Sequence, residues 1–554
     1  MPKRLYHKSK NLYAKYKKPF WIITAIISFL LIFLISVAGS LRLFFPYLPQ
    51  LTGFPFSQKN YLVIFQNNTE LRPSGGFISS YGILSFQSGI FKGLSINDVY
   101  GDIDNHPYLE PPYPMKELLA NRWYTGYNFR DGNFQADYPK SAEELIRLFH
   151  LSKPNPEIDG VIAVNFSFLE DLLEAIGPIE VEGQIFTSTN LFENLENSVN
   201  DIDRHNVEAL ANRKSILKPL ANAIIKKIVF NPFKTRKISD TITQNLVKKD
   251  IQLYFKDQSL GKIIAKHNWD GSWPKNSINQ DFLALVEANL GGMKSNRYIQ
   301  RNITYHLRFD EDALQNNADA KAEVQVEMNH FGIENIPLSG PYTGYLRFYS
   351  SPDQIKPQDE IIKLNMGESK TVTKTYNISS QVLQKNHYKL FIPKQSGTDD
   401  FYSLIIEFPR GYQVQSNDFQ SKENFAYFQG KLTKDAEFEL TLLPDKNPPR
   451  VVHQHLSELG KIELHFNEDL NQAHASDPFS YEVEDLNKNH PKKSDELRIR
   501  KIETTSKDVT IYVTGMTEQP EEHYSVLLKN LRDTHGNILT ERKITVVQRL
   551  GQAD

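Results

Sequence analysis

A continuous apolar segment near the N-terminus constrains this chain more than any other feature. Residues 20–41 contain no charged side chain, and residues 1–18 carry seven Lys or Arg residues and no acidic residue. A helix of about 22 residues, rising about 1.5 Å per residue, is long enough to cross the hydrocarbon core of a bilayer. Because basic residues gather at the cytoplasmic ends of such helices, we predict a cytoplasmic tail at 1–18 and a transmembrane anchor at 19–45.

The anchor also predicts where the rest of the chain lies. No later stretch approaches 18 consecutive apolar residues, so we expect a single-pass cell-membrane protein with everything after the anchor outside the cytoplasm. A cleavable signal peptide is the alternative, although its apolar region is normally only about 7 to 15 residues long. An extracytoplasmic location disfavours ATP- or NAD-dependent chemistry, and the sequence has no Walker A or GxGxxG motif.

Length and composition narrow the function classes further. A chain of 554 residues is too long for one hydrophobic core, so several domains are expected. Its net charge of −2 provides no global basic field for binding nucleic acid. The absence of cysteine excludes disulfides, cysteine-zinc sites, thiol nucleophiles and iron-sulfur clusters.

The best candidate site follows the apolar run at residues 61–65. This run is short and rich in β-forming residues, which predicts a strand buried on both faces. It is followed by the polar residues 66–70, by Arg72, and by Gly75 and Gly76, which allow a sharp turn or a close approach of backbone to a ligand. Polar residues at the end of a buried strand are typical of α/β binding sites. An ordinary strand-loop-strand with a solvated arginine is the alternative.

Acidic residues near this strand suggest a metal site. Two more strands are predicted at 77–86 and 93–100, and the second carries Asp98 near its end, followed by Asp102 and Asp104. Carboxylate oxygens are the ligands that Mg²⁺ or Ca²⁺ prefers. A solvated acidic loop explains the same spacing.

A second charged group precedes a predicted helix. Ser141 and Glu144 form a capping box that predicts the helix start, so Arg130, Asp131 and Asp137 are expected in the loop before it. A helix N-terminus offers hydrogen-bond donors to an anion. A surface ion pair between Arg130 and Asp131 is the alternative interpretation.

Residues 159–182 predict a layered α/β domain. The β-branched run at 159–166 reads as a strand, a capping box of Ser167 and Glu170 opens a helix that ends at residue 176, and a second strand is expected at 179–182. Strand, helix and strand at this spacing predict a βαβ-like unit.

A basic pair suggests a phosphate contact in the helical region that follows. Arg213 and Lys214 stand at the start of an amphipathic run at 215–229. Positive charge is unfavourable at a helix N-terminus unless an anion binds there. A solvated helix end is the alternative.

Several segments together resemble a known family. The segments NYLVIFQNNTELRPSGGF, NFRDGNFQADYPKSA, DGVIAVNFSFLEDLLEAIGPIEVEG and NLGGMKSN resemble the domain-of-unknown-function 4012 family of membrane-anchored bacterial proteins. That family is similar to the LytR-CpsA-Psr group, in which extracytoplasmic phosphotransferases move glycopolymers from polyprenyl pyrophosphate to peptidoglycan with Mg²⁺ and several arginines. The resemblance covers residues 58–300 and implies a LytR-CpsA-Psr-like α/β domain there.

The resemblance implies roles for individual residues. Arg72, Arg213 and Asp98 fall where the group has arginines and a metal-binding acid, whereas Asn97 stands in place of an arginine, and Gly75 and Gly76 in place of an acid. Together with the charged groups described above, these positions give the predicted site: catalytic residues Arg72, Arg130, Asp131 and Arg213; substrate-binding residues Asn68, Gly75, Gly76 and Lys214; and metal ligands Asp98 and Asp137. Mg²⁺, a polyprenyl-phosphate lipid and cell-wall glycan are the implied cofactor and partners.

The remaining chain is predicted to be β-rich. Short strands between Gly, Pro and Asn turns predict a β-sandwich domain at 301–445, in which PYTGYLRFY and PKQSGT again resemble the 4012 family. After the linker at Asn447, residues 447–548 resemble bacterial Ig-like repeats of surface proteins.

Two functions from different classes remain open. The first is a membrane-anchored phosphotransferase that attaches polyprenyl-pyrophosphate-linked glycopolymers to the cell wall. The second is a non-catalytic envelope protein that keeps the α/β fold, binds lipid or glycan, and presents β-domains for interaction. The two are separated by whether the predicted arginines and aspartates face one pocket.

Overall fold

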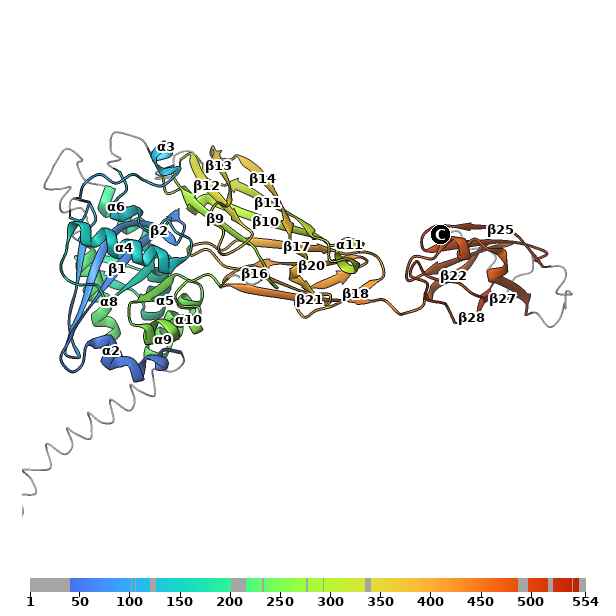
Figure 1. Ribbon diagram of the computed structural model, residues 1–554, viewed down its shortest axis with the longest axis horizontal. Helices are drawn as coiled ribbons and strands as arrows, with labels where there is room; N and C mark the ends of the chain where they lie inside the picture. Colours follow the sequence, from blue (N-terminus) through green and yellow to red (C-terminus); the bar gives the residue numbers. More distant parts are fainter. Residues whose placement is uncertain are drawn as a thin grey trace, which may run out of the picture.

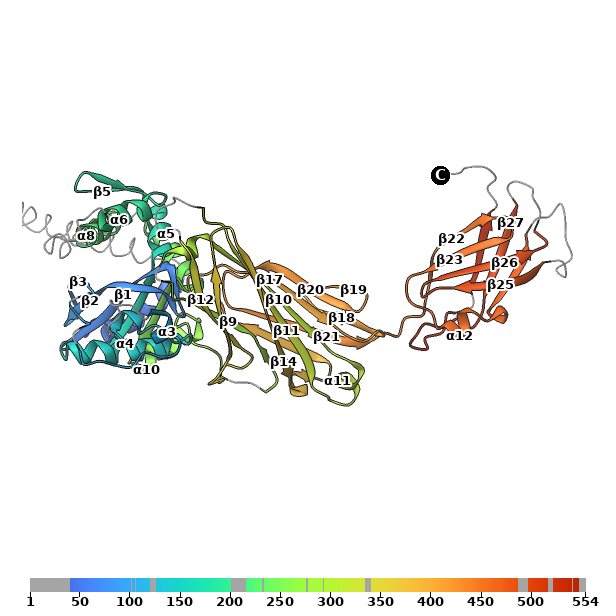
Figure 2. The same ribbon diagram turned by 90° about the horizontal axis from the view of Figure 1, so that it is seen from above.

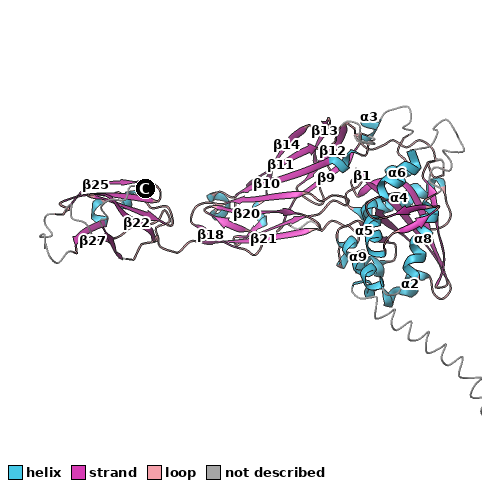
Figure 3. Ribbon diagram, turned by 180° about the vertical axis from the view of Figure 1, so that it is seen from behind, coloured by secondary structure: helices cyan, strands magenta, loops and turns pink. Residues whose placement is uncertain are grey.

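The molecule is elongated, and most of its helices lie at one end (Figures 1, 2 and 3). The computed structural model describes residues 40–100, 102–104, 106–119, 126–200, 216–231, 234–275, 278–291, 293–333, 340–486, 497–516, 522–540 and 542–547. Within these residues, no helix is long and apolar enough to cross a membrane. The predicted anchor lies outside the described residues up to residue 39, and its remaining part belongs to the 3₁₀ helix η1 (Ser40–Tyr47).

The first domain is built on a five-stranded sheet with the order β3-β2-β1-β4-β7. Its strands are β1 (Gln58–Arg72), β2 (Gly75–Gln87), β3 (Ile90–Asp98), β4 (Gly160–Asn165) and β7 (Ile251–Phe255). Strands β1 and β4 are parallel, whereas the other neighbours are antiparallel. A separate short pair consists of β5 (Ile179–Val181) and β6 (Gln184–Phe186).

Helices cover both faces of this sheet. On one face, Leu62 and Ile64 pack in the same core cluster as Leu145 of α4, and on the other Tyr61 packs with Leu172 of α5. The predicted burial of strand 61–65 on both faces is therefore confirmed. The helices are α2 (Leu48–Thr52), α3 (Met115–Leu119), α4 (Tyr138–Ser152), α5 (Phe166–Ile176), α6 (Leu191–Asn200), α8 (Leu217–Val229), α9 (Thr235–Val247) and α10 (Gln258–Lys266), with short 3₁₀ helices η2 (Phe129–Asp131) and η4 (Ser295–Tyr298).

Two local predictions for this domain are wrong. The strand at 61–65 does not stop before the polar residues, because β1 continues to Arg72 with a bulge between Asn67 and Leu71. The strand predicted at 179–182 does not join the main sheet, since β1 and β7 already occupy both sides of β4. The parallel connection instead runs from β1 to β4, and α4 lies within it.

Both predicted helix starts also differ from the structure. Helix α4 begins at Tyr138, with Pro139 in its first turn, because proline favours the first helical positions. The hydroxyl of Ser141 therefore bonds to the backbone of Gln135 instead of capping the helix. Helix α5 begins at Phe166, one residue before the predicted cap Ser167.

The second domain consists of two layers of β-sheet around one core. One layer is a six-stranded sheet of β14 (Ser369–Ile378), β11 (Ala320–His330), β10 (Ile299–Arg308), β17 (Phe401–Glu407), β20 (Phe425–Lys431) and β19 (Gln420–Lys422). The other layer contains β13 (Gln358–Leu364), β12 (Tyr342–Tyr349) and β9 (Ala284–Asn289), and a second sheet of β15 (Leu383–Gln384), β16 (His387–Ile392), β21 (Ala436–Pro444), β18 (Tyr412–Gln415) and β8 (Asp281–Phe282). Two short helical segments, α11 (Glu311–Gln315) and η5 (Ser380–Val382), join strands.

Strand pairing places the start of this domain earlier than residue 301. Strands β8 and β9 pair with β16 and β12, although both precede residue 290. Alternate residues of β11 are buried, as expected for a strand with one face on a core. The prediction of a multidomain, sheet-rich chain is confirmed.

The C-terminal domain has a core of its own. One sheet has the order β22-β23-β26-β25 and the other β24-β27-β28. The elements are β22 (Val451–Glu458), β23 (Lys461–Phe466), α12 (Gln472–Ala475), η6 (Pro478–Ser480), β24 (Tyr481–Asp485), β25 (Arg498–Thr504), β26 (Asp508–Thr514), β27 (His523–Leu528) and β28 (Arg542–Val547). This domain lies at the opposite end of the molecule from the α/β domain (Figure 1).

Candidate functional site

The parallel pairing of β1 with β4 ends where Gln66 lies opposite Asn165. Both side chains are buried, and both oxygen atoms of their amides lack a hydrogen-bond partner among the described residues. The edge formed by the carboxyl ends of parallel strands is where α/β domains usually bind ligands. The predicted site therefore lies at the sheet edge where such domains bind ligands, and the amide oxygens of Gln66 and Asn165 are available there as hydrogen-bond acceptors.

Glycines bring the start of β2 close to this edge. Gly75 has a φ of +145°, and a Cβ atom there would lie 2.0 Å from Oε1 of Gln66. A Cβ atom on Gly76 would lie 2.2 Å from the carbonyl carbon of Asn67. The packing of β2 against β1 thus accounts for both glycines, and their predicted contact with substrate stays a prediction.

A loop from the second domain covers the same edge. We call residues 393–400, between β16 and β17, the junction loop. The amide of Asn165 donates to Oγ of Ser396 over 3.0 Å. A Cβ atom on Gly397 would lie 2.9 Å from the Cβ of Asn68. The junction loop therefore fills the space beyond the strand ends.

Arg72 links the end of β1 to the second domain. Arg72 is 1% exposed, and its guanidinium donates to the carbonyl of Asn289 over 2.5 Å and pairs with Glu70 at 3.1 Å. It also lies 5.1 Å from the ring centre of Phe77. Only its Nε atom lacks a hydrogen-bond partner among the described residues. The charge of Arg72 is thus largely engaged inside the junction between the domains.

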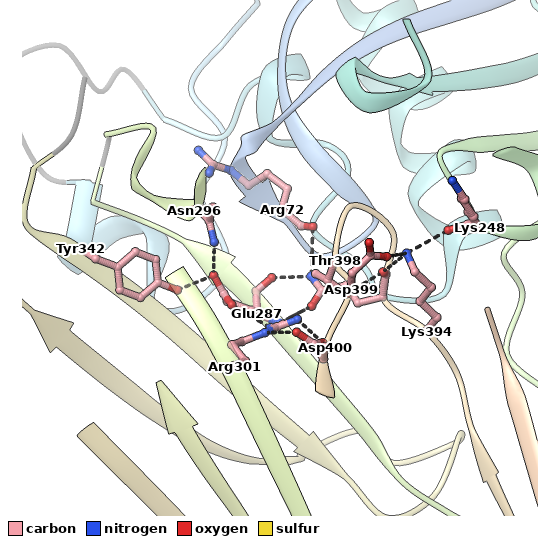
Figure 4. A network of polar contacts seen from close by, with 11 residues as sticks. Arg72, Lys248, Glu287, Asn296, Arg301, Tyr342, Lys394, Thr398, Asp399 and Asp400 are labelled. Atoms are coloured by element: carbon pink, nitrogen blue, oxygen red, sulfur yellow. Dashed lines mark hydrogen bonds and ion pairs between the residues drawn. The ribbon is translucent and has the colours of Figure 1, made fainter. Parts of the chain in front are cut away.

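A buried ion cluster continues the junction on the second domain (Figure 4). Arg301 on β10 binds both oxygens of Asp400, at 2.8 and 2.5 Å, and donates to Glu287 of β9 at 2.7 Å. Burial alone lowers the pKa of Arg301, but the carboxylates of Asp400 and Glu287 raise it above its ordinary value. Tyr342 and Asn296 donate to the other oxygen of Glu287, both over 2.5 Å. Arg301, Asp400 and Glu287 therefore each have at least one ion-pair partner inside the cluster.

Two junction-loop side chains complete the contact. The amide of Gln395 donates to the carbonyls of Arg72 and Glu287, at 3.2 and 2.7 Å. Lys394 donates to the carbonyl of Lys248 at 2.9 Å, and burial lowers its pKa. Polar groups buried with partners of this kind fix the relative position of two packed surfaces. The polar contacts of Lys394 and Gln395 therefore hold the α/β domain and the second domain together.

Arg130 and Asp131 lie in η2, beside the same region of the α/β domain. Arg130 pairs with Asp104 at 2.5 Å and with Asp131 at 3.9 Å. Burial raises the pKa of Asp131 to about 6, against the opposing effects of Arg130 and Arg72. Burial likewise raises the pKa of Asp104. Of the predicted catalytic residues, Arg130 and Asp131 are therefore buried side by side, whereas the hydrogen bonds and ion pair of Arg72 are with Leu71, Asn289 and Glu70.

The two predicted metal ligands have other neighbours. Asp98 lies opposite Ser80 on the sheet and accepts a hydrogen bond from the backbone of Tyr100 at 3.1 Å. Asp137 accepts from the backbone of Trp273 at 3.3 Å and pairs with Lys140. In the described ranges, no three acidic or histidine side chains are arranged to hold a metal ion. Magnesium binding stays a prediction.

Asn68 lines an open cleft at the junction. The cleft has a volume of about 670 Å³ and lies between the bulge of β1 and the junction loop. Its walls include Glu170 of α5, Arg297 of η4 and Lys431 of β20. Arg213 and Lys214 lie outside the described residues.

The residues that form the junction were not predicted as site residues. Glu287, Arg301, Lys394 and Gln395 were absent from the predicted set, although Asn289 and Asn296 fall in the quoted segment NLGGMKSN. The segment PKQSGT likewise supplies the start of the junction loop. The resemblance of both segments to one family is the signal that could have pointed to the junction, although the family match at residues 57–199 reaches neither segment.

Comparisons with known proteins give one family match. A family model described as a protein of unknown function, DUF4012, matches residues 57–199, which confirms that part of the predicted resemblance. No curated protein matches the chain. The match includes the strand ends and the Arg130–Asp131 pair.

Solved structures match only weakly. The N-terminal part of the bacterial S-layer protein SbsC is 16% identical, with 19% of this chain and 24% of that chain covered and a TM-score of 0.17. The Lin1025 protein from Listeria innocua is 11% identical, with 39% and 79% covered and a TM-score of 0.22. The transcriptional regulator yvhJ from Bacillus subtilis is 13% identical, with 38% and 76% covered and a TM-score of 0.21. Over residues 57–199, the chain is similar to a family of unknown function.

Proposed function

We propose that the protein is a membrane-anchored, extracytoplasmic envelope protein whose α/β domain is a non-catalytic support for its β-domains. The basic tail and the apolar segment at 20–41 support the membrane location. The elongated arrangement in Figure 1 supports the presentation of the C-terminal, Ig-like domain at a distance from the helical end.

The observation that carries this proposal is the engagement of the predicted anion-binding arginines. The guanidinium of Arg72 donates to the carbonyl of Asn289 and pairs with Glu70. The guanidinium of Arg130 pairs with Asp104. Both are more than nine-tenths buried. A pyrophosphate site needs arginines whose donors point at the substrate, whereas these arginines hold protein groups.

A second candidate is a LytR-CpsA-Psr-like phosphotransferase. One observation favours it: Arg72 and Arg130 both act on the buried carboxylate of Asp131, and Oδ2 of Asp131 has no hydrogen-bond partner among the described residues. Such a cluster would suit a polyprenyl-pyrophosphate substrate if the junction loop moved away. Mg²⁺ would then have to be held by Asp98 or Asp137 together with the substrate.

A direct assay separates the two candidates. The purified full-length chain would be incubated with Mg²⁺, a polyprenyl-pyrophosphate-linked oligosaccharide and peptidoglycan fragments, and the release of the lipid phosphate measured by mass spectrometry. We expect no release above the protein-free control. Release by the wild type that is lost in Arg130→Gln would overturn the non-catalytic proposal. Protease protection of residues 1–18 in sealed cells tests the membrane orientation separately.

A further inference from the structure

A second cleft lies between the α/β domain and the sheet of β9, β12 and β13. Its volume is about 760 Å³, which is within the usual range for small-molecule binding sites. Five aromatic residues line it: Tyr113, Phe134, Trp273, Tyr345 and Tyr349. The loop before α3 brings Tyr113 against Tyr345 of β12, and these two elements lie side by side in Figure 1. Both domains therefore contribute rings to one cleft.

The rings form two adjoining groups. Phe134 and Tyr345 are stacked, with centroids 6.5 Å apart and planes within 9°, and Tyr113 meets Tyr345 edge-on at 5.9 Å. Trp273 meets Tyr349 edge-on at 4.8 Å. Tyr113 is 59% exposed, so its ring is available to a ligand. Phe134, Tyr345 and Tyr349 are at most 8% exposed, so the aromatic surface that a ligand can reach is that of Tyr113 and the half-buried Trp273.

Charged and polar groups lie among these rings. Arg347 is 7% exposed and lies 4.9 Å from the ring centre of Phe134, whose carbonyl it binds at 3.0 Å. Its Nε atom has no hydrogen-bond partner among the described residues. Asp359 accepts from the hydroxyl of Tyr345 at 2.7 Å, and Asp137 pairs with Lys140 at 3.1 Å. The cleft therefore combines aromatic faces with both donors and acceptors.

We propose that this cleft binds an oligosaccharide. A sugar ring presents a face of C–H groups, which packs on aromatic rings, and a rim of hydroxyls, which need donors and acceptors of both kinds. A lipid tail would remove the charges of Asp137, Lys140 and Asp359 from water and offer them no hydrogen bond in return. A nucleic acid would bring phosphates against the same carboxylates. The cleft shares only Asp137 with the predicted catalytic and metal-binding residues, so the proposal does not depend on the function proposed above.

Tyr113 and Tyr108 provide a matched pair for the test. Tyr108 is 62% exposed, similar to Tyr113, but it does not line the cleft. The full-length chain in detergent would be titrated with two probes, a β-1,4-linked N-acetylglucosamine tetrasaccharide and an α-1,4-linked galacturonate tetrasaccharide. Binding would be followed by calorimetry and by tryptophan fluorescence, with Trp273→Phe used to identify the reporter.

We expect saturable binding of at least one probe by the wild type and by Tyr108→Ala. Tyr113→Ala should weaken it about fivefold, because one stacking partner is lost. Arg347→Gln should weaken the acidic probe more than the neutral one. Because Tyr113 is exposed, its replacement should leave the circular dichroism spectrum unchanged. The proposal is overturned if neither probe binds the wild type, or if Tyr113→Ala binds as tightly as Tyr108→Ala.

Discussion

Buried charges at the junction are paired with unusual completeness. Arg301 is 4% exposed and satisfies Asp400 and Glu287 at once, while Tyr342 and Asn296 satisfy the remaining oxygen of Glu287. A buried ion pair of this kind is not in itself strong evidence of stabilisation, because desolvation offsets much of the attraction. Replacing only Arg301, however, leaves the carboxylates of Asp400 and Glu287 buried without their cationic partner.

Arg301→Met is therefore expected to lower the free energy of unfolding by about 3–5 kcal/mol. The matched control is Arg308→Met on the same strand, where the side chain is 67% exposed and lies 3.7 Å from Glu407. An exposed pair contributes at most about 1 kcal/mol. Urea unfolding followed by tryptophan fluorescence measures both. Equal midpoints for the two variants would contradict this account of the junction.

Asp131 predicts a pH dependence of stability. Its pKa in the folded chain is raised to about 6 from the model-compound value of 3.8, mainly by burial. Because the carboxyl pKa is higher in the folded chain than in the unfolded chain, the ionised carboxylate destabilises the folded chain above pH 6. The folded chain becomes more stable as the pH falls from 6 towards 4, because Asp131 is protonated first in the folded chain. The cost at neutral pH is on the order of 3 kcal/mol.

Asp131→Asn should consequently unfold at a higher temperature than the wild type at pH 8. The difference should shrink between pH 6 and pH 4, where Asp131 becomes protonated in the folded chain. Thermal unfolding monitored by circular dichroism at pH 8, 6 and 4 provides the measurement. A difference that does not vary with pH would show that Asp131 does not titrate in this range.

At the scale of elements, the path of β1 and β2 depends on one glycine contact. The bulge between Asn67 and Leu71 lets β1 continue to Arg72, and β2 begins only three residues later. Gly75 lies in this tight return and faces Gln66 and Asn165. The close contact at the strand ends therefore tolerates no side chain at this position.

Gly75→Ala is expected to destabilise the α/β domain more than Gly93→Ala. The two glycines have nearly the same φ, +145° and +144°, but a Cβ atom on Gly93 meets nothing within 4 Å. Backbone strain is thus common to both variants, and overpacking adds about 1–3 kcal/mol only at Gly75. Chemical unfolding of the two variants measures the difference. Equal losses would mean that strain, and not packing, requires glycine at position 75.

Elements whose pattern lies within one short segment were predictable from the sequence. Strand partners that lie far apart in the sequence were not. The apolar run at 61–65 and the helix that became α5 were recognisable from the spacing of their own residues. The strand at 179–182 was recognisable too, but its partner was not. Whether β5 could pair with β4 depended on β7, which lies about 70 residues later in the chain.

At the scale of the whole molecule, the first two domains share a polar, buried junction, whereas the third has a separate core. Its contacts with the second domain are peripheral: Arg410 pairs with Asp469, and Asn537 donates to the carbonyl of Asp445 at 3.1 Å. Figures 1 and 2 show a single connecting segment of chain between these two domains. We therefore expect two cooperative units in the described part of the chain.

Calorimetry of the full-length chain should resolve two transitions. Deletion of residues 447–554 should remove one of them and shift the other by less than about 3 °C, since few contacts cross the linker. Arg301→Met should lower only the transition that survives the deletion. Separate transitions for the α/β domain and the second domain would contradict a cohesive junction.

The sequence by itself determined the location of the first buried strand, the α/β character of the first domain and the β-rich character of the rest, because hydrophobic periodicity and turn residues act over short distances. It also singled out Arg72, Arg130 and Asp131, whose catalytic role stays a prediction. Only the tertiary structure decided which groups surround these residues. Arg72 meets Asn289, 217 residues away, and the junction loop meets Asn165, 231 residues away. Such contacts depend on how two separate cores pack, and no local pattern encodes that.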